Sequence, residues 1–295
     1  MSTSIVIPTY YRPDDLSELL DSLLNQTAKP VETIVVDDTP TNLVKIVCEE
    51  YEIKFESKGS RLIYIKNPRE RSAAIARNIG TERAIGDIVV FLDSDVVIYP
   101  DYIEKITAIF KEHPNALGVQ GWDVNARKVG THLLIKAVQT FFRLKHYVKD
   151  SCKFAEYPYL LTKTINCEYL HGSNFAVKRD VLAESRFDET LKKYSYMEDL
   201  LFSYSIYQKY ASSLYITPSA KCMHKGSKEG RMETAERRSH LRQCRKHVLT
   251  KLFGVKGSLI YYWQSIGMLV IDLAGKIWGF LPRTKHEHPE KNTVT

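Results

Sequence analysis

Residues 88 to 95 read Ile88-Val89-Val90-Phe91-Leu92-Asp93-Ser94-Asp95, an apolar run that ends in two aspartates. The run predicts a buried β-strand, with both aspartates just beyond its carboxyl end. Two carboxylates placed two residues apart can share a divalent cation, one by direct ligation and one through water or a ligand hydroxyl. A cation held there would neutralise a diphosphate. The alternative is a solvated pair of acids, because isolated Asp-x-Asp sequences are common in polar loops.

The chain before this strand alternates between short apolar runs and amphipathic stretches. Strands are predicted at 5–7, 33–36, 62–65 and 88–92, and helices at 16–24, 43–51 and 72–85. Such alternation indicates an α/β fold with a mostly parallel sheet. A helix over 100–111 and an extended segment over 118–121 follow. The alternation of strands and helices is then lost, and residues 124–170 would suit a variable region that faces an acceptor substrate.

Polar side chains follow the predicted strands. They are Pro8-Thr9-Tyr10, Asp37-Asp38, Asn67 and Asp93 to Asp95. In open α/β sheets, ligands bind beyond the carboxyl ends of the strands, so these residues should converge in space. The sequence therefore predicts one nucleotide pocket at this edge of the sheet.

Composition limits the classes of protein to consider. The 295 residues are 44% apolar and 26% charged, enough for one large α/β domain or for a domain with an appendage. A formal charge of +7 suits phosphate-bearing substrates or an anionic membrane surface. We find no nucleic-acid reader motif and expect no nucleic-acid partner.

Cysteine usage and the N-terminus bear on the compartment. The five cysteines are odd in number, scattered and free of any Cys-x-x-Cys pair, which favours a reducing cytosol. The N-terminus enters an apolar strand at once, and no secretory signal is visible. We therefore expect a cytoplasmic protein, located at the cytoplasmic face of the membrane.

Several motifs occur in one order and at workable spacing. They are Ile5-Val6-Ile7-Pro8-Thr9-Tyr10, Ile34-Val35-Val36-Asp37-Asp38, Ala76-Arg77-Asn78-Ile79-Gly80, Phe91-Leu92-Asp93-Ser94-Asp95, His171-Gly172-Ser173-Asn174 and Glu198-Asp199. As a set, they resemble family 2 glycosyltransferases, which are inverting enzymes of the GT-A fold that use nucleotide sugars. The resemblance covers about residues 4 to 225. It implies a catalytic domain over 1–225, built as an α/β nucleotide-binding sheet flanked by helices.

The resemblance assigns the donor-binding residues. The turn Pro8-Thr9-Tyr10 would line the base pocket, and Asp38, in preference to Asp37, would hydrogen-bond the base or ribose. Arg77 corresponds to a nucleotide contact of the family, because a guanidinium can stack on a base or bind phosphate. The alternative for Arg77 is a salt bridge on a helix surface. Thr39-Pro40-Thr41 replaces the Gly-Ser run often found after the second strand.

The resemblance also assigns a metal site. Asp93 would contact the ribose and the metal, Ser94 would lie at the nucleotide, and Asp95 would ligate the metal directly. His224 resembles a late histidine that completes the site in some members, and imidazole suits Mn²⁺ better than Mg²⁺. The implied cofactor is Mn²⁺ or Mg²⁺. The alternative for His224 is an ordinary surface or core histidine.

Glu198-Asp199 precedes an apolar helix, and the family places its general base on the Asp of such a pair. Asp199 is therefore the expected base, with Glu198 as the supporting acid. The alternative is a pair of acids favoured by the helix dipole. No Gln-x-x-Arg-Trp sequence follows the pair, which disfavours processive polymer synthesis.

Residues 226–282 form a basic and then amphipathic extension. Lys and Arg are abundant between 225 and 256, and Leu259, Trp263, Ile266, Val270, Leu273 and Ile277 then repeat at helical spacing. This order predicts peripheral attachment to an anionic membrane, and with it a lipid-linked acceptor. The alternative is a helix packed on the domain or at a dimer contact. Residues 283–295 are predicted to be a disordered tail.

These features predict an enzyme that moves a sugar from a nucleotide sugar to an acceptor hydroxyl. A UDP-sugar is the favoured donor and a GDP-sugar the alternative, and the acceptor would be a lipid-linked or cell-surface glycan. Glycine-rich phosphate loops of pyrophosphorylases and dinucleotide oxidoreductases are absent beside Pro8-Thr9-Tyr10. The alternative from another class is an inactive sugar-nucleotide-binding or scaffolding protein with the same fold.

Overall fold

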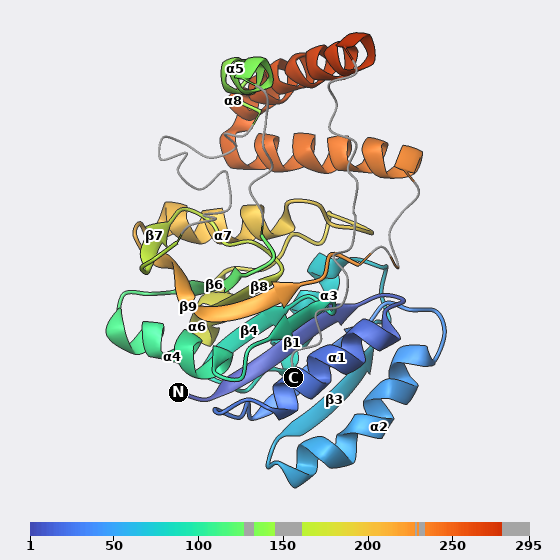
Figure 1. The fold of residues 1–295 in the computed structure, drawn as a ribbon, viewed down its shortest axis with the longest axis vertical. Coiled ribbons are helices and arrows are strands. Elements are labelled where there is room, and N and C mark those ends of the chain that lie inside the picture. Colours follow the sequence, from blue (N-terminus) through green and yellow to red (C-terminus); the bar gives the residue numbers. More distant parts are fainter. Residues whose placement is uncertain (127–132, 145–160, 228, 230–233, 279–295) are drawn as a thin grey trace.

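The computed structural model of the chain describes residues 1–126, 133–144, 161–227, 229 and 234–278. Its centre is a nine-stranded sheet with the strand order β3-β2-β1-β4-β8-β6-β9-β5, and β7 pairs with β9 (Figure 1). The strands are β1 (Thr3–Thr9), β2 (Glu32–Asp37), β3 (Arg61–Lys66), β4 (Ile88–Leu92), β5 (Val96–Ile98), β6 (Gly118–Asp123), β7 (Ile165–Cys167), β8 (Asn174–Lys178) and β9 (Leu214–His224).

The first four strands form a parallel half-sheet, as the alternation of strands and helices predicts. β1 pairs in parallel with β2 and β4, and β2 pairs in parallel with β3. Every residue of β2 and β4 is buried, which explains their continuous runs of Val and Ile. The helices of this half are α1 (Pro13–Leu24), α2 (Leu43–Ser57) and α3 (Ala73–Arg83).

The second half of the sheet contains parallel and antiparallel pairs, whereas the sequence predicts a mostly parallel sheet. β8 runs antiparallel to β4 and β6, and β5 and β7 run antiparallel to β9. For β5 the reason is local: no helix separates β4 from β5, so the chain turns at Asp93 to Asp95 without a parallel crossover. That turn and the end of β9 form one corner of the ligand edge.

Helices cover both faces of the sheet and create two cores. Apolar side chains of α1, α2 and α4 (Tyr102–Glu112) share one buried cluster with the strands. Those of α3, α6 (Arg179–Glu184) and α7 (Glu198–Lys209) share the other. The fold is thus an α/β sheet between two helical layers.

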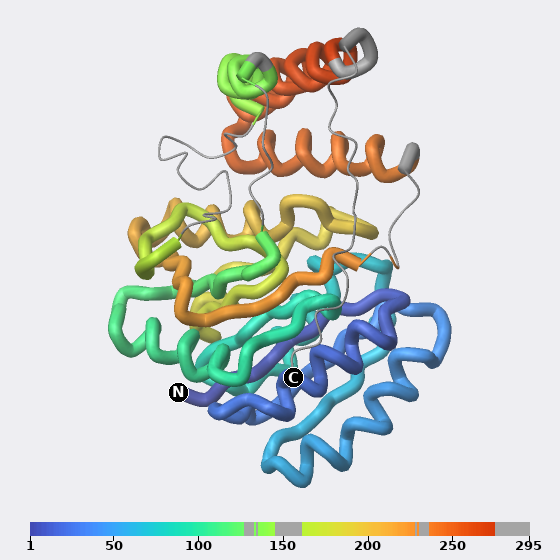
Figure 2. The backbone as a smooth tube through the Cα atoms, in the orientation of Figure 1, coloured from blue at the N-terminus to red at the C-terminus, as the bar shows by residue number. Residues whose placement is uncertain are grey.

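The C-terminal helix α8 (Thr234–Trp278) forms a further layer with α5 (Leu133–Phe141), as Figures 1 and 2 show at the top of the molecule. Gly254 breaks α8 with φ 59° and ψ −137°, a backbone conformation that favours glycine. The inner segment, before Gly254, packs Cys244 and Val248 against α7. The outer segment, after Gly254, lies beyond the inner one and beside α5 (Figure 2).

The described part of the chain contains no helix that is long and apolar enough to span a membrane. The predicted tail, residues 283–295, lies outside the described residues, as do 127–132 and 145–160 of the expected acceptor-facing region. The boundary between a catalytic domain over 1–225 and the extension stays a prediction.

Candidate active site

A cavity of about 630 Å³ opens at the carboxyl ends of the parallel strands. Most of the residues expected at the site line it: Pro8, Thr9, Tyr10, Asp38, Arg77, Asp93, Ser94, Glu198, Asp199 and His224. Asp37 and Asn67, also expected at the strand ends, do not line it, and Asn67 instead donates a hydrogen bond to Asp38. Asp95 lies below the surface and is 2% exposed. The predicted convergence of the strand ends is therefore confirmed.

The two acids that end β2 point in different directions, as consecutive residues of a strand do. Asp37 is fully buried and accepts hydrogen bonds from Thr39 N at 2.7 Å and from the Tyr64 hydroxyl at 2.9 Å. Asp38 lines the cavity and accepts hydrogen bonds from Ser72 N, at 3.1 Å, and from Asn67. Burial raises the pKa of Asp38, against the effect of these hydrogen bonds. The geometry thus leaves Asp38 as the acid that a ligand can reach.

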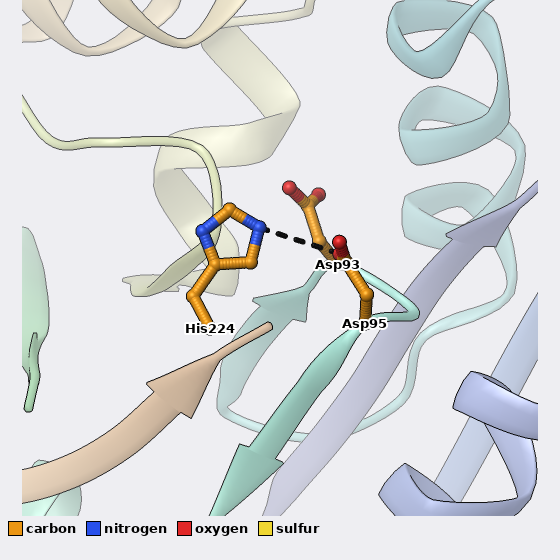
Figure 3. Close-up of side chains that lie close together, drawn as sticks. All are labelled: Asp93, Asp95 and His224. Carbon is orange, nitrogen blue, oxygen red and sulfur yellow. Dashed lines mark ion pairs between the residues drawn. The ribbon is translucent and has the colours of Figure 1, made fainter. Parts of the chain in front are cut away.

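The predicted metal ligands Asp93, Asp95 and His224 meet at one corner of the cavity. One donor atom of each lies within 4.8 Å of the other two, and Figure 3 shows the side chains converging from the β4–β5 turn and the end of β9. The cause is the strand register, because Val96 of β5 pairs directly with His224 of β9. A histidine distant in sequence is thereby fixed beside the two aspartates.

Asp95 holds the most strongly ionised carboxylate of this corner. Burial opposes ionisation, but His224, the Arg12 guanidinium and the backbone N–H of Ser227 lower the pKa of Asp95 to about 2. Its Oδ1 lies 2.9 Å from Arg12 Nη1 and 3.4 Å from His224 Nε2. Both contacts are ion pairs, and no aligned hydrogen bond to this buried oxygen is found among the described residues. The two carboxylates and the imidazole, whose donor atoms lie close together, fit a divalent cation.

Arg77 connects the corner formed by Asp93, Asp95 and His224 to the start of α7. It is 2% exposed, and its Nη2 donates to Asp93 Oδ1 at 2.8 Å and to the Gly172 carbonyl at 3.2 Å. Its Nη1 forms an ion pair with Glu198. Burial would lower the pKa of Arg77, but the carboxylates of Glu198, Asp93 and Asp199 raise it. Arg77 is therefore a buried charge centre rather than a surface salt bridge, and its contact with a nucleotide stays a prediction.

Glu198 and Asp199 begin α7 after Met197, which has φ 67°. Asp199 Oδ2 accepts a hydrogen bond from Gly172 N at 2.7 Å, and its Oδ1 accepts one from Leu200 N at 2.8 Å. A Cβ at Gly172 would lie 3.2 Å from Asp199 Oδ2, so a larger residue would crowd the carboxylate. Asp199 is thus held in one orientation at the cavity wall.

The two acids have different environments. Glu198 is 8% exposed, and burial raises its pKa to about 8, against the effect of Arg77 and with the effect of Asp199 and Asp93. Burial also raises the pKa of Asp93, and Arg77 opposes the shift. Glu198 is thus a buried partner of Arg77, whereas Asp199 is oriented by backbone N–H groups, so the two neighbouring acids can take different roles.

Several cavity residues were not identified from the sequence. Arg12 lies two residues after Tyr10 of the strand-end turn, and it links Asp95 to the carbonyls of Ser227 and Glu229. Arg71 stacks on Tyr10, with its guanidinium carbon 3.4 Å from the ring centroid. The position of Arg12 beside the Pro8-Thr9-Tyr10 turn is the signal that could have identified it.

These groups together offer three residues that could hold a cation, at one corner of the cavity, and an oriented carboxylate, Asp199, in the cavity wall. The family Glycosyl transferase family 2 has a sequence model that matches residues 4–186. A glucosyl-dolichyl phosphate glucuronosyltransferase of Haloferax volcanii is 28% identical over 191 residues, 62% of this chain and 55% of that protein. An uncharacterized glycosyltransferase of Haemophilus influenzae is 33% identical over 113 residues, 38% of this chain and 35% of that protein. The chain thus spans about a third to about half of these relatives.

Solved structures share the fold at low sequence identity. The mannosyltransferase PcManGT of Pyrobaculum calidifontis, in complex with GDP-Man and Mn²⁺, has a TM-score of 0.61 at 16% identity over 95% of this chain and 76% of that one. Residues 1–349 of S. aureus TarS, in complex with UDP-GlcNAc, have a TM-score of 0.59 at 18% identity over 94% and 76%. These likenesses confirm the GT-A-type fold. Because the family match covers more than half of the sequence, the chain belongs to glycosyl transferase family 2.

Proposed function

We propose that the chain transfers a sugar from a nucleoside diphosphate sugar to an acceptor hydroxyl, with inversion at the anomeric carbon. The observation that carries this proposal is the placement of three cation-ligand side chains and an oriented carboxylate at one cavity. Asp93, Asp95 and His224 have donor atoms within 4.8 Å of one another, and Asp199 lines the same cavity. One group of residues can therefore receive the diphosphate while another receives the acceptor.

The donor is a UDP-sugar or, as the alternative, a GDP-sugar. Both nucleotides have precedents in structures of this fold, since TarS binds UDP-GlcNAc and PcManGT binds GDP-Man with Mn²⁺. We favour UDP because it is the commoner partner of a metal-bound Asp-x-Asp in the family. Tyr10 and Asp38 would contact the base or ribose, and Asp93 and Ser94 would lie beside the diphosphate.

Asp93, Asp95 and His224 would hold the divalent cation. When bound, the cation offsets the negative charge that develops on the departing diphosphate. Mn²⁺ fits better than Mg²⁺, because one of the three donors is an imidazole nitrogen. Arg77 keeps Asp93 in position through its hydrogen bond to Oδ1, at 2.8 Å.

Asp199 is the proposed general base. The acceptor oxygen forms a bond to the anomeric carbon, the bond from that carbon to the diphosphate oxygen breaks, and the acceptor proton moves to Asp199. The N–H groups of Gly172 and Leu200 hold the carboxylate in place, which leaves its remaining lone pairs for the proton. Glu198, paired with Arg77, supports the start of the helix that carries the base.

The acceptor is proposed to be a lipid-linked or cell-surface glycan, processed at the cytoplasmic face of a membrane. The name of the Haloferax volcanii relative, a glucosyl-dolichyl phosphate glucuronosyltransferase, supports a lipid-linked class. The alternative, an inactive sugar-nucleotide-binding protein, is less consistent with this site. Asp93, Asp95 and Asp199 are all present: Asp93 and Asp199 line one cavity, and Asp95 lies just beneath it, with a carboxylate oxygen within 4.8 Å of the donor atoms of Asp93 and His224.

Slow donor hydrolysis tests the proposal without knowledge of the acceptor. UDP-sugars and GDP-sugars would be incubated with the chain, with Mn²⁺ or with EDTA, and nucleoside diphosphate release would be measured. We expect metal-dependent release from one donor class, and NMR of the freed sugar should show the inverted anomer. Release equal to that without protein for every donor would favour the inactive binding protein, and a retained anomer would contradict inversion.

A further inference from the structure

The outer segment of α8 exposes apolar side chains and buries small or polar ones. Its outer face consists of eight residues that are 38% to 81% exposed: Val255, Leu259, Tyr262, Trp263, Ile266, Leu269, Val270 and Leu273. Gly257, Gln264 and Gly267, on the opposite side, are buried. This distribution is the reverse of that in a helix that packs on its own domain.

The eight residues occupy one side of the helix, because their spacings of three, four and seven residues return to the same face. The sequence leaves two interpretations of this stripe, membrane attachment or packing on the domain. Packing on the domain would bury the stripe. Within the described residues the stripe is instead exposed. Trp263, at its edge, and the opposite side of the helix make the intramolecular contacts.

Specific contacts fix this orientation. Gln264 Nε2 donates to the Arg143 carbonyl at 2.7 Å, and Trp263 Nε1 donates to the Phe141 carbonyl at 3.0 Å. A Cβ on Gly267 would lie 2.3 Å from Phe142 Cβ, so the close packing of this side on α5 requires a glycine. The helix therefore cannot rotate to bury its apolar face without losing these contacts.

The segment that carries this face is rich in basic residues, although Arg245 is buried, Lys251 forms an ion pair with Asp188, and the exposed Asp272 follows directly after it. Residues 237–271 contain seven Lys or Arg and no Asp or Glu: Arg237, Arg238, Arg242, Arg245, Lys246, Lys251 and Lys256. Without these seven, the 42 Lys and Arg of the chain become 35, equal to its 35 Asp and Glu. The formal excess charge of +7 thus equals the charge of this one segment. Lys246 Nζ lies 3.1 Å from the Tyr262 hydroxyl, so at least one of these cations borders the outer face directly.

We propose that the outer face of α8 docks on an anionic lipid surface, with the helix lying in the plane of the interface. Apolar side chains would enter the boundary between headgroups and acyl chains, and the neighbouring cations would contact anionic headgroups. Trp263 and Tyr262 are residue types that favour this depth. The further step, that this contact presents a membrane-borne acceptor to the cavity, rests on the proposed function.

A second copy of the chain is a weaker candidate for the occupant. A symmetric contact through the outer face would bring the Lys246 and Lys256 groups of both copies to one interface, and like charges there oppose association. An anionic lipid surface supplies the opposite charge instead. The lipid surface is therefore the occupant that matches both the apolar face and its border.

Vesicle cosedimentation of the full chain tests the proposal. Vesicles of phosphatidylcholine alone would be compared with vesicles that also contain phosphatidylglycerol, at low and high salt. We expect binding to the anionic vesicles that weakens with salt. The variant Leu259→Ser/Ile266→Ser should lose about tenfold or more of this affinity, because two exposed side chains no longer enter the lipid.

The matched control is Ile46→Ser/Ile53→Ser on α2. Ile46 and Ile53 are 50% and 76% exposed, close to the 50% of Ile266 and the 65% of Leu259, but they lie outside α8. This control should bind vesicles like the unchanged chain. Absence of binding to anionic vesicles, or equal loss in both variants, would overturn the proposal. A third result would also overturn it: the unchanged chain is a dimer by light scattering and does not bind vesicles, and Leu259→Ser/Ile266→Ser is a monomer.

The vesicle assay uses no donor and no acceptor. If the proposed glycosyl transfer is wrong but the surface is correct, vesicle binding persists while donor hydrolysis is absent. If the surface is wrong, donor hydrolysis persists while vesicle binding is absent. The two failures are therefore distinguishable.

Discussion

The cavity and the outer segment of α8 reverse the usual placement of side chains in opposite ways. In the cavity, charged groups are buried, with Arg77 at 2% exposure and Glu198 at 8%. On α8, large apolar groups are exposed, with Leu259 at 65% and Ile266 at 50%. A charge remains buried only when partners compensate it, and the chain supplies partners for Arg77 and Glu198. The described chain supplies no comparable cover for the apolar face. The buried charges of the cavity thus have partners within the chain, whereas the exposed apolar face of α8 requires a partner outside it.

The largest expected effect tests the chemistry of the cavity. Asp199→Asn should reduce transfer by roughly 10² to 10⁴-fold, because the amide cannot accept the acceptor proton. Donor affinity should change little, since Asp199 is not among the residues assigned to the donor or to the metal. Single-turnover rates and nucleotide titrations would measure the two quantities. Asp180→Asn, an exposed acid in the first turn of α6, is the control. Unchanged turnover in Asp199→Asn would remove Asp199 from the role of base.

The second prediction concerns removal of the buried positive charge that pairs with the acids of the cavity. Arg77→Met should lower the free energy of unfolding by about 3 to 5 kcal/mol, because Asp93 and Glu198 lose their buried partner. Denaturant unfolding would measure the difference. Arg83→Met, an exposed position on the same helix, should change the free energy of unfolding by less than about 0.5 kcal/mol. Equal effects of both substitutions would mean that Arg77 does not organise the site.

A smaller effect tests how α8 is attached to the catalytic domain. Asp188 accepts hydrogen bonds from His247, at 2.7 Å, and from Lys251, at 2.9 Å, both on the inner segment of α8. Asp188→Asn should lower the free energy of unfolding by about 1 to 2 kcal/mol at neutral pH. Denaturant unfolding, with Asp180→Asn as the control, would measure this loss. A loss no larger than that of the control would show that this contact does not stabilise the attachment.

The same contact predicts a pH dependence. Burial opposes ionisation of Asp188, but Lys251, His247 and Thr190 hold its pKa well below the ordinary range. A depressed folded pKa stabilises the fold above the unfolded pKa, near 3.9, and the contribution is lost as the pH falls. The difference between Asp188→Asn and the unchanged chain should therefore shrink below about pH 4. A constant difference down to lower pH would exclude ionisation as the source of the stabilisation.

The sequence predicted the cavity better than it predicted the surface. Strand ends such as Pro8-Thr9-Tyr10 and Asp38 were predictable because parallel strands place their carboxyl ends together. The position of His224 depends on the pairing of β9 with β5, which no local pattern encodes. The direction of the apolar stripe on α8 could not be predicted either, since periodicity defines a stripe but not what covers it. Only contacts such as that of Gln264 with Arg143 determine which side faces outward.

The most direct test of the central claim is a thermal-shift panel of UDP, GDP, CDP and dTDP, each with Mn²⁺ and with EDTA. We predict that UDP raises the unfolding temperature with Mn²⁺ but not with EDTA, because a ligand that binds only the folded chain stabilises it. Asp95→Asn should abolish this shift, since it removes the carboxylate charge with little change of shape. A shift of equal size in EDTA, or no shift with any of the four nucleotides, would contradict a metal-dependent nucleotide site.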